Sequence, residues 1–247
     1  MKWLSIFLLL GISGFAVSKS IKLDSLRSTF GQQNKDEILR KFNMENLTIL
    51  ERCVMTVVVG LTNLCCWPAL YVVYKQNLLL TFWNGIFTFV CSFMYHMMEP
   101  LNIEKIYLTG SQWHKLDNIG SIMWFVLLAI YMMDNAPRQP IESPPMCNTD
   151  IHLFFIGLFL ALIMQTEHPW KLENTLVPVV LFLILLLLSV TLRGPGKYRS
   201  SQLKRGGIFL LIAFYCFGKG LDDDNDYLRI FHGCWHMFGS IAIFYIN

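Results

Sequence analysis

The sequence predicts an all-α, polytopic membrane protein, with a seven-transmembrane helix bundle after a cleavable signal peptide. Hydrophobic residues make up 54% of the 247 residues and charged residues 15%, against about 25% in a soluble domain. The mean hydropathy is +0.47. The apolar residues come in blocks of about 17–25, the length that crosses a bilayer. This composition argues against a soluble enzyme and excludes a disordered chain.

The first apolar block, Met1–Ser18, has the features of a signal peptide. Lys2 provides a positive start, and Ala16-Val17-Ser18 fits a signal-peptidase site at the end of the block. An uncleaved membrane helix is the alternative, and in both cases the chain enters the secretory pathway. A polar tail follows over Lys19–Arg52, and the sequon at Asn46 is usable only if this tail is luminal.

Seven apolar segments then form a transmembrane domain over residues 53–247. The fourth and sixth segments are short for a bilayer core of about 30 Å, so we expect them to extend or to be protected by neighbours. Prolines in the first and fifth segments are tolerated in membrane helices. The predicted spans are Cys53–Tyr74, Leu78–Met98, Asp117–Met133, Ile151–Gln165, Leu176–Leu192, Gly206–Leu221 and Tyr227–Tyr245.

Charged loops predict the orientation of the bundle. The loop Arg193–Arg205 carries five basic residues and no acid, which is typical of a cytosolic loop; a site for a phosphate or lipid headgroup is the alternative. The loop before the last span contains the acidic run Asp222–Asp226. The amino terminus is therefore predicted to be luminal or extracellular and the carboxyl terminus cytosolic. The host membrane would be the endoplasmic reticulum, the Golgi or the plasma membrane.

Five polar side chains are predicted to lie at one depth in this topology. His96 lies near the luminal end of the second span, and Ser92 lies one turn deeper on the same face, about 6 Å away. Asp117 opens the third span, while His232 and His236 occupy the first turns of the seventh. Because ionisable groups inside a membrane are costly and usually functional, this level of the bundle is the candidate site.

The histidine pattern predicts a zinc site. His232 and His236 are four residues apart, so they share a helix face at a separation suited to one metal ion. With His96 they would form the three-histidine set of catalytic zinc, which leaves a position for water and lowers its pKa to about 7. Asp117 is the candidate base, and Ser92 would hydrogen-bond the reacting group. Histidines packed against other helices are the alternative.

Neighbouring polar groups have simpler interpretations. Glu99-Pro100 is typical of a helix stop, and the acidic run Asp222–Asp226 is predicted to be a solvated loop. His114 either orients Asp117 or lies in the headgroup region beside Trp113. The net charge of +3 is too small to indicate nucleic-acid binding.

The combination of Ser92-x-x-x-His96, Asp117 and His232-x-x-x-His236 resembles the hallmark of the CREST superfamily of seven-helix membrane proteins. This group includes alkaline ceramidases, progestin and adiponectin-type receptors and myomaker-like proteins. The resemblance extends from about Cys53 to Asn247 and implies that the three histidines bind zinc while the serine and aspartate complete the site. Phe93-Met94-Tyr95-His96, and Asp226-Tyr227 ahead of the last histidine pair, resemble the myomaker-like branch most.

We therefore expect an intramembrane zinc-dependent hydrolase that cleaves an amide or ester bond of a lipid in the luminal or outer leaflet. Its substrate would be ceramide-, phospholipid- or GPI-like. The catalytic residues would be Asp117 and Ser92, and the metal ligands His96, His232 and His236. One alternative is a non-enzymatic, myomaker-like protein of membrane fusion or lipid organisation with structural zinc. A seven-helix receptor is the other, and protein partners are not specified by the sequence.

Overall fold

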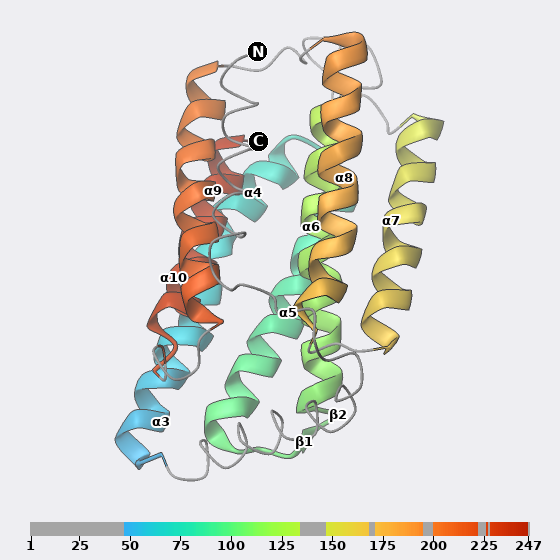
Figure 1. Cartoon of the computed structure of the whole chain (residues 1–247). Coiled ribbons are helices and arrows are strands. Elements are labelled where there is room, and N and C mark those ends of the chain that lie inside the picture. Colours follow the sequence, from blue (N-terminus) through green and yellow to red (C-terminus); the bar gives the residue numbers. More distant parts are fainter. Residues whose placement is uncertain are drawn as a thin grey trace, which may run out of the picture.

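The computed structural model describes residues 47–133, 147–167, 171–194, 200–221, 226 and 228–246 (Figure 1). Over these residues the chain forms seven helical segments that alternate in direction (Figure 1). The predicted all-α, polytopic membrane class is confirmed. The predicted signal peptide Met1–Ser18, most of the tail and residue Asn46 lie outside the described residues.

The first segment is one continuous helix with two irregular turns. It comprises α3 (Ile49–Met55), the π-helix η1 (Thr56–Leu61), the 3-10 helix η2 (Asn63–Cys66) and α4 (Trp67–Lys75). The irregular turns directly precede Pro68, whose ring clashes with the preceding turn and which has no N–H for the helix ladder. A capping box between Thr48 and Glu51 starts α3.

The other six segments coincide with the remaining predicted spans, and most are longer at their ends. The fourth and sixth spans extend to 20 and 21 residues, which resolves their shortness in the sequence. A pair of two-residue antiparallel strands joins the second and third helices. The bounds are α5 (Leu79–Leu101), β1 (Lys105–Ile106), β2 (Leu108–Thr109), α6 (Gly110–Met133), α7 (Asn148–Glu167), α8 (Leu172–Arg193), α9 (Ser200–Gly220) and α10 (Ile230–Ile246).

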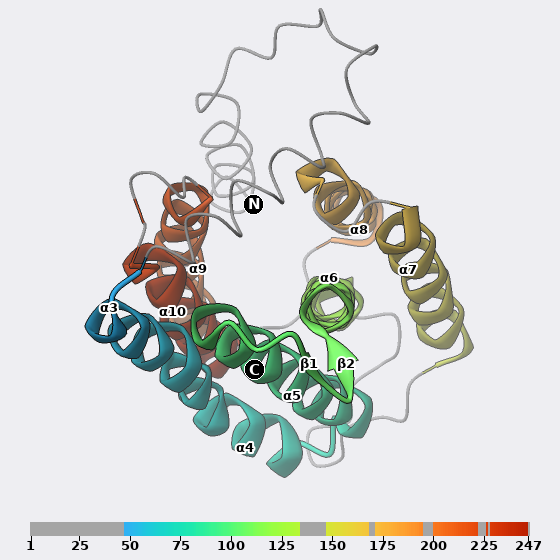
Figure 2. The ribbon, with the colours of Figure 1, turned by 90° about the horizontal axis from the view of Figure 1, so that it is seen from below.

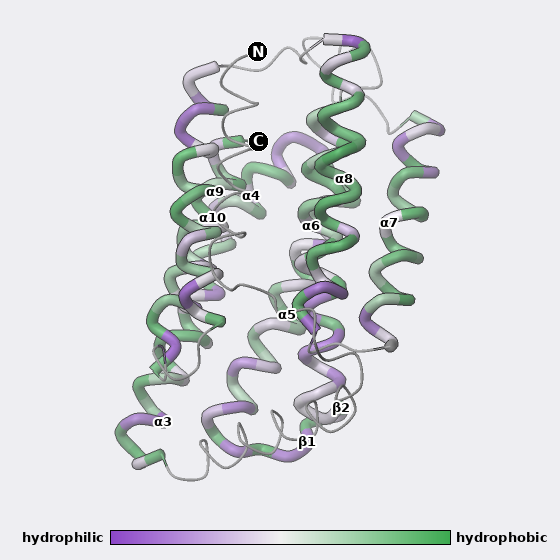
Figure 3. The backbone as a smooth tube through the Cα atoms, in the orientation of Figure 1, coloured by the Kyte–Doolittle hydropathy of each residue, from purple (hydrophilic) through white to green (hydrophobic). Residues whose placement is uncertain are grey.

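Four of these segments are long and apolar enough to cross a membrane by length and composition, namely the first segment, α6, α7 and α8. Helix α10 is apolar but shorter, with 17 residues. Hydropathy along the chain shows the same contrast, because α7 and α8 are hydrophobic over most of their length while the ends of α5 and α6 near the strands are mixed (Figure 3). Hydrophilic residues lie at both ends of the bundle, and apolar residues fill most of the length between them.

Helix α6 lies between two groups of helices (Figure 2). On one side it packs against α7 and α8, and on the other against α5, while α10 packs against α9 and the first segment. The apolar core lies between α6, α7 and α8 and includes the fully buried Val126, Ala161 and Phe182. Other large apolar side chains on α7 and α8, such as Phe159 and Leu188, are exposed and suited to contact with lipid.

Candidate metal centre

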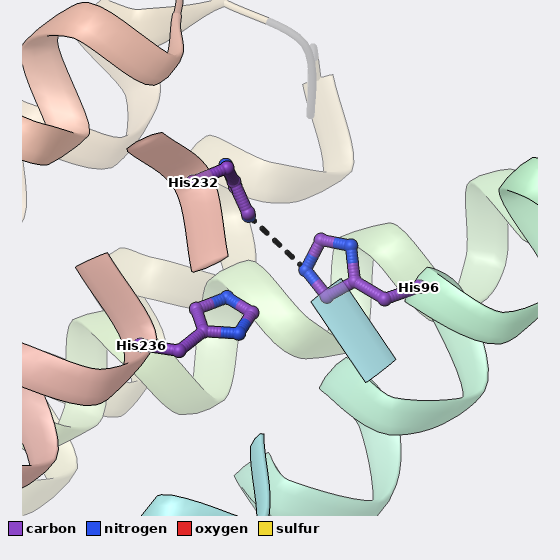
Figure 4. Close-up of side chains that lie close together, drawn as sticks. All are labelled: His96, His232 and His236. Carbon is purple, nitrogen blue, oxygen red and sulfur yellow. Dashed lines mark hydrogen bonds between the residues drawn. The ribbon is translucent and has the colours of Figure 1, made fainter. Parts of the chain in front are cut away.

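Three histidines converge between the C-terminal part of α5 and the first turns of α10. His96 extends from α5, and His232 and His236 extend from successive turns of α10 (Figure 4). The Nε2 atoms of His96 and His232 are 3.2 Å apart. One ring nitrogen from each of the three residues lies within 4.8 Å of the other two. Within the described part of the chain, this arrangement gathers three imidazole nitrogens from α5 and α10 in one place.

The spacing of one nitrogen pair, from His96 and His232, fits a zinc ion. Zinc–nitrogen bonds of about 2.0–2.1 Å in tetrahedral geometry place two ligand nitrogens about 3.4 Å apart. The 3.2 Å separation between His96 and His232 is close to this value. The buried Nδ1 atom of His236 has no hydrogen-bond partner among the described residues. Buried polar atoms are nearly always paired, so an unpaired imidazole nitrogen is expected where a histidine coordinates a metal ion. The donor set and its spacing therefore suit three-histidine coordination.

Asp117 and Ser92 lie beside the histidines. An Asp117 carboxylate oxygen is 3.9 Å from the Nε2 atom of His96. The Ser92 hydroxyl donates a hydrogen bond to the same carboxylate. Both residues are buried, with 9% of Asp117 and 4% of Ser92 exposed. Ser92 is thus placed to orient the carboxylate, and its contact with a reacting group stays a prediction.

Asp117 does not open its helix, which corrects the predicted start of the third span. Helix α6 begins at Gly110, and Asp117 lies two turns inside it. The reason is a reciprocal cap that the sequence analysis missed. The Thr109 N–H donates to the Gln112 side chain at 2.9 Å, and the Gln112 N–H donates to the Thr109 hydroxyl at 3.3 Å. The spacing T-x-x-Q was the available signal.

Two glycines allow the helices to approach closely at this level. A Cβ atom added to Gly233 would lie 2.8 Å from the backbone oxygen of Val58, and one added to Gly220 would lie 2.9 Å from the backbone nitrogen of His232. Small residues at such contacts let membrane helices pack backbone to backbone. They bring α10 against the π-helix η1 and against α9, and this fixes the helix that carries two of the histidines.

A buried acid, Asp226, also holds the start of α10, contrary to its predicted place in a solvated loop. The Asp226 carboxylate is 4% exposed and accepts hydrogen bonds from the N–H groups of Phe231 and His232, at 3.0 and 3.1 Å. It caps a helix rather than facing solvent, since the first N–H groups of a helix need acceptors. The rest of the acidic run, Asp222, Asp223 and Asp224, lies outside the described residues.

Glu99 lies at the end of helix α5, which stops two residues later at Leu101, as the Glu99-Pro100 pair predicted. The Glu99 carboxylate also forms an ion pair with Arg229 at 3.5 Å, which the sequence did not indicate. The hydroxyl of Tyr95 donates to the same carboxylate at 3.3 Å. The His114 ring contacts the Tyr95 ring in a tilted arrangement, with ring centroids 4.7 Å apart. A second buried polar layer therefore lies next to the histidines.

Comparison with known proteins places the chain in one family. The family model described as "Protein of unknown function (DUF3522)" matches residues 51–237. This match covers well over half of the chain and contains Ser92, Asp117 and all three histidines of the site. No curated protein matches the chain.

Proposed function

The chain belongs to the DUF3522 family, and we propose that it is an intramembrane zinc-dependent hydrolase acting on a membrane lipid. The observation that carries this proposal is the convergence of the three histidine nitrogens within 4.8 Å, next to a buried carboxylate. Ionisable groups at this density inside an apolar bundle are rarely kept without a role in binding or chemistry. The residue pattern resembling the CREST superfamily supports the same assignment.

The chain's own residues suit hydrolysis of an amide or ester. Bound zinc would polarise the scissile carbonyl and make a water molecule more nucleophilic. Asp117, 3.9 Å from His96, then accepts the proton of the attacking water and transfers it to the leaving amine or alcohol. Ser92 is a positioning residue that orients the carboxylate through its hydrogen bond.

The proposed substrate is a ceramide-, phospholipid- or GPI-like lipid that enters from the bilayer. The site lies among helices that are apolar on their outer faces, so a lipid reaches it without leaving the hydrocarbon region. We further propose that the site faces the luminal or outer leaflet of a secretory-pathway membrane. The basic segment Arg193–Arg205 supports this orientation through the positive-inside rule, because it leads into α9, whose opposite end at Gly220 lies against His232.

A structural zinc site is the second candidate function, in a non-enzymatic membrane protein of the myomaker-like type. The Asp117 carboxylate is the observation that favours it. Three histidines and one carboxylate complete a tetrahedral shell, and a closed shell has no position for water or substrate. An inward shift of Asp117 by less than 1 Å would place its oxygen at ligand spacing from His96.

Metal content measured together with lipid turnover distinguishes these candidates. We expect the detergent-purified chain to hold about one zinc per chain and to hydrolyse one lipid class in mixed vesicles. The double variant H232A/H236A should lose both zinc and turnover. H152A, an exposed histidine of α7, is the matched control and should lose neither. Zinc at full occupancy in the double variant contradicts the metal site, and zinc without turnover of any lipid class contradicts the hydrolase.

A further inference from the structure

Two pairs of side chains join α5 to the start of α10: the histidine pair His96–His232 and, one helical turn away, the ion pair Glu99–Arg229. His96 and His232 meet at 3.2 Å, and Glu99 and Arg229 meet at 3.5 Å. Glu99 follows His96 by three residues on α5, whereas Arg229 precedes His232 by three residues ahead of α10. The two segments run in opposite directions. A step of three residues forward on α5 therefore matches a step of three residues back from His232, and Glu99 lies opposite Arg229 as His96 lies opposite His232. The ion pair is thus the next contact along the same helix–helix seam.

This ion pair is buried and held from several sides. The exposed fractions of the Arg229 and Glu99 side chains are 4% and 10%. The Arg229 guanidinium also donates to the carbonyl oxygen of Gly220 at 3.5 Å, and the Tyr95 hydroxyl donates to Glu99. Both charged groups are near enough to His232 to act on it electrostatically. The pair therefore connects α5, the end of α9 and the entry to α10.

The backbone at Arg229 is in a conformation that arginine rarely adopts. Its φ angle is +60°, in the left-handed region, where the Cβ atom approaches the following carbonyl. The surroundings maintain this conformation, since the Arg229 N–H donates to the Asp226 carbonyl at 2.8 Å and its own carbonyl accepts from Gly233 at 2.8 Å. Strain of this kind persists where other contacts fix the chain, and often at functional sites.

We propose that Glu99 and Arg229 are positioning residues for the metal centre, whose ion pair sets the register of α10 against α5 and so the distance between His232 and His96. A buried ion pair adds little net stability, because desolvation offsets the attraction, but it can fix one arrangement of neighbouring helices. Groups that hold metal ligands in place contribute about 10–100-fold to metal affinity. The inference rests on the proposed metal site.

The test measures zinc affinity by chelator competition on the folded, detergent-purified chain, with the visible spectrum of cobalt(II) as a second readout. E99Q and R229M should each bind zinc about 10–100-fold more weakly and give an altered cobalt spectrum. R229K keeps the charge and should show a smaller loss than R229M. A role in stability alone would lower the unfolding temperature and leave the cobalt spectrum of the folded protein unchanged.

The matched control is Q165L. Gln165 is fully buried and links α6 to α8 through Asn118 and Thr175, away from the histidines. Q165L should lower stability and keep wild-type zinc affinity. If a single variant does not fold, E99Q/R229M removes both charges, avoids an unpaired buried ion and should still bind zinc weakly. Wild-type affinity and spectrum in the folded variants overturn this inference, whereas absence of metal from the wild-type chain overturns the proposed function.

Discussion

Two buried clusters share helix α6 and differ in what holds them together. Between α6, α7 and α8 the core is apolar apart from the buried Gln165 link, and Ile122, Val126 and Phe182 are fully buried. Between α5, α6 and α10 apolar contacts such as Phe125–Trp235 surround a buried polar cluster that includes His96, Asp117 and the histidines of α10. One helix therefore presents an apolar face to one side and a carboxylate to the other.

The difference shows how stability and chemistry are divided in this bundle. Lipid tails are as apolar as a leucine side chain, so the apolar cluster is stabilised by close packing rather than by transfer from water. The polar cluster costs free energy unless each group finds a hydrogen bond, an ion pair or a metal ion. Changes in the apolar cluster should therefore affect folding, and changes in the polar cluster should affect binding and turnover.

The largest expected effect comes from D117N. Asparagine keeps the shape of the side chain but cannot accept a proton, so lipid turnover should fall about 10²–10⁴-fold while the unfolding temperature stays near that of the wild-type chain. Steady-state turnover in mixed vesicles, with zinc content as the control, provides the measurement. If D117N loses turnover but retains zinc, Asp117 is a base. If D117N loses zinc, Asp117 is a fourth ligand, which supports a structural site. Undiminished turnover in D117N contradicts the role of Asp117.

Phe182→Ala tests the apolar cluster. The side chain is fully buried between α6 and α7, so its removal leaves a cavity and should lower the free energy of unfolding by about 3–5 kcal/mol. Zinc affinity of the folded fraction should not change. Leu188→Ala is the control on the same helix, because Leu188 is 50% exposed and its loss should have little effect. Loss of zinc from folded F182A would show that the two clusters are not independent.

The smallest expected effect comes from S92A. This change removes one hydrogen bond to Asp117, which is worth about 0.5–1.5 kcal/mol, or up to about tenfold in turnover. Zinc content should stay at the wild-type level. A loss as large as that of D117N would mean that Ser92 contacts the reacting group, as the sequence first suggested.

Apolar blocks predict the architecture well because their lengths are set by the thickness of the bilayer. All seven segments coincide with helices, and the largest shift of an element start, at α6, comes from a cap that uses polar residues outside the apolar block. The depth of each residue in the bundle suggested that His96, Asp117 and His232 meet, because helices that alternate in direction place their ends at one of the two membrane surfaces. The four-residue spacing of His232 and His236 predicted in addition that these two side chains lie on the same face of α10.

The polar contacts around the site could not be read from one sequence. Glu99 and Asp226 each occur beside a helix end, where a stop or a solvated loop is the ordinary interpretation. Their burial depends on how α9 and α10 pack, and that packing depends on Gly220 and Gly233. The positions of these glycines in the sequence have no recognisable relation to those of the two acids. The equal three-residue spacings of Glu99 and Arg229 from the histidines become meaningful only once α5 and α10 are known to be neighbours.

X-ray absorption at the zinc edge of the purified, full-length chain tests the central claim most directly. The account predicts bound zinc with three imidazole nitrogens at about 2.0–2.1 Å and one oxygen at similar distance. H96A should lower the number of imidazole ligands or remove the metal. An absence of zinc, a sulfur ligand from one of the cysteines, or an unchanged spectrum in H96A would contradict the three-histidine centre.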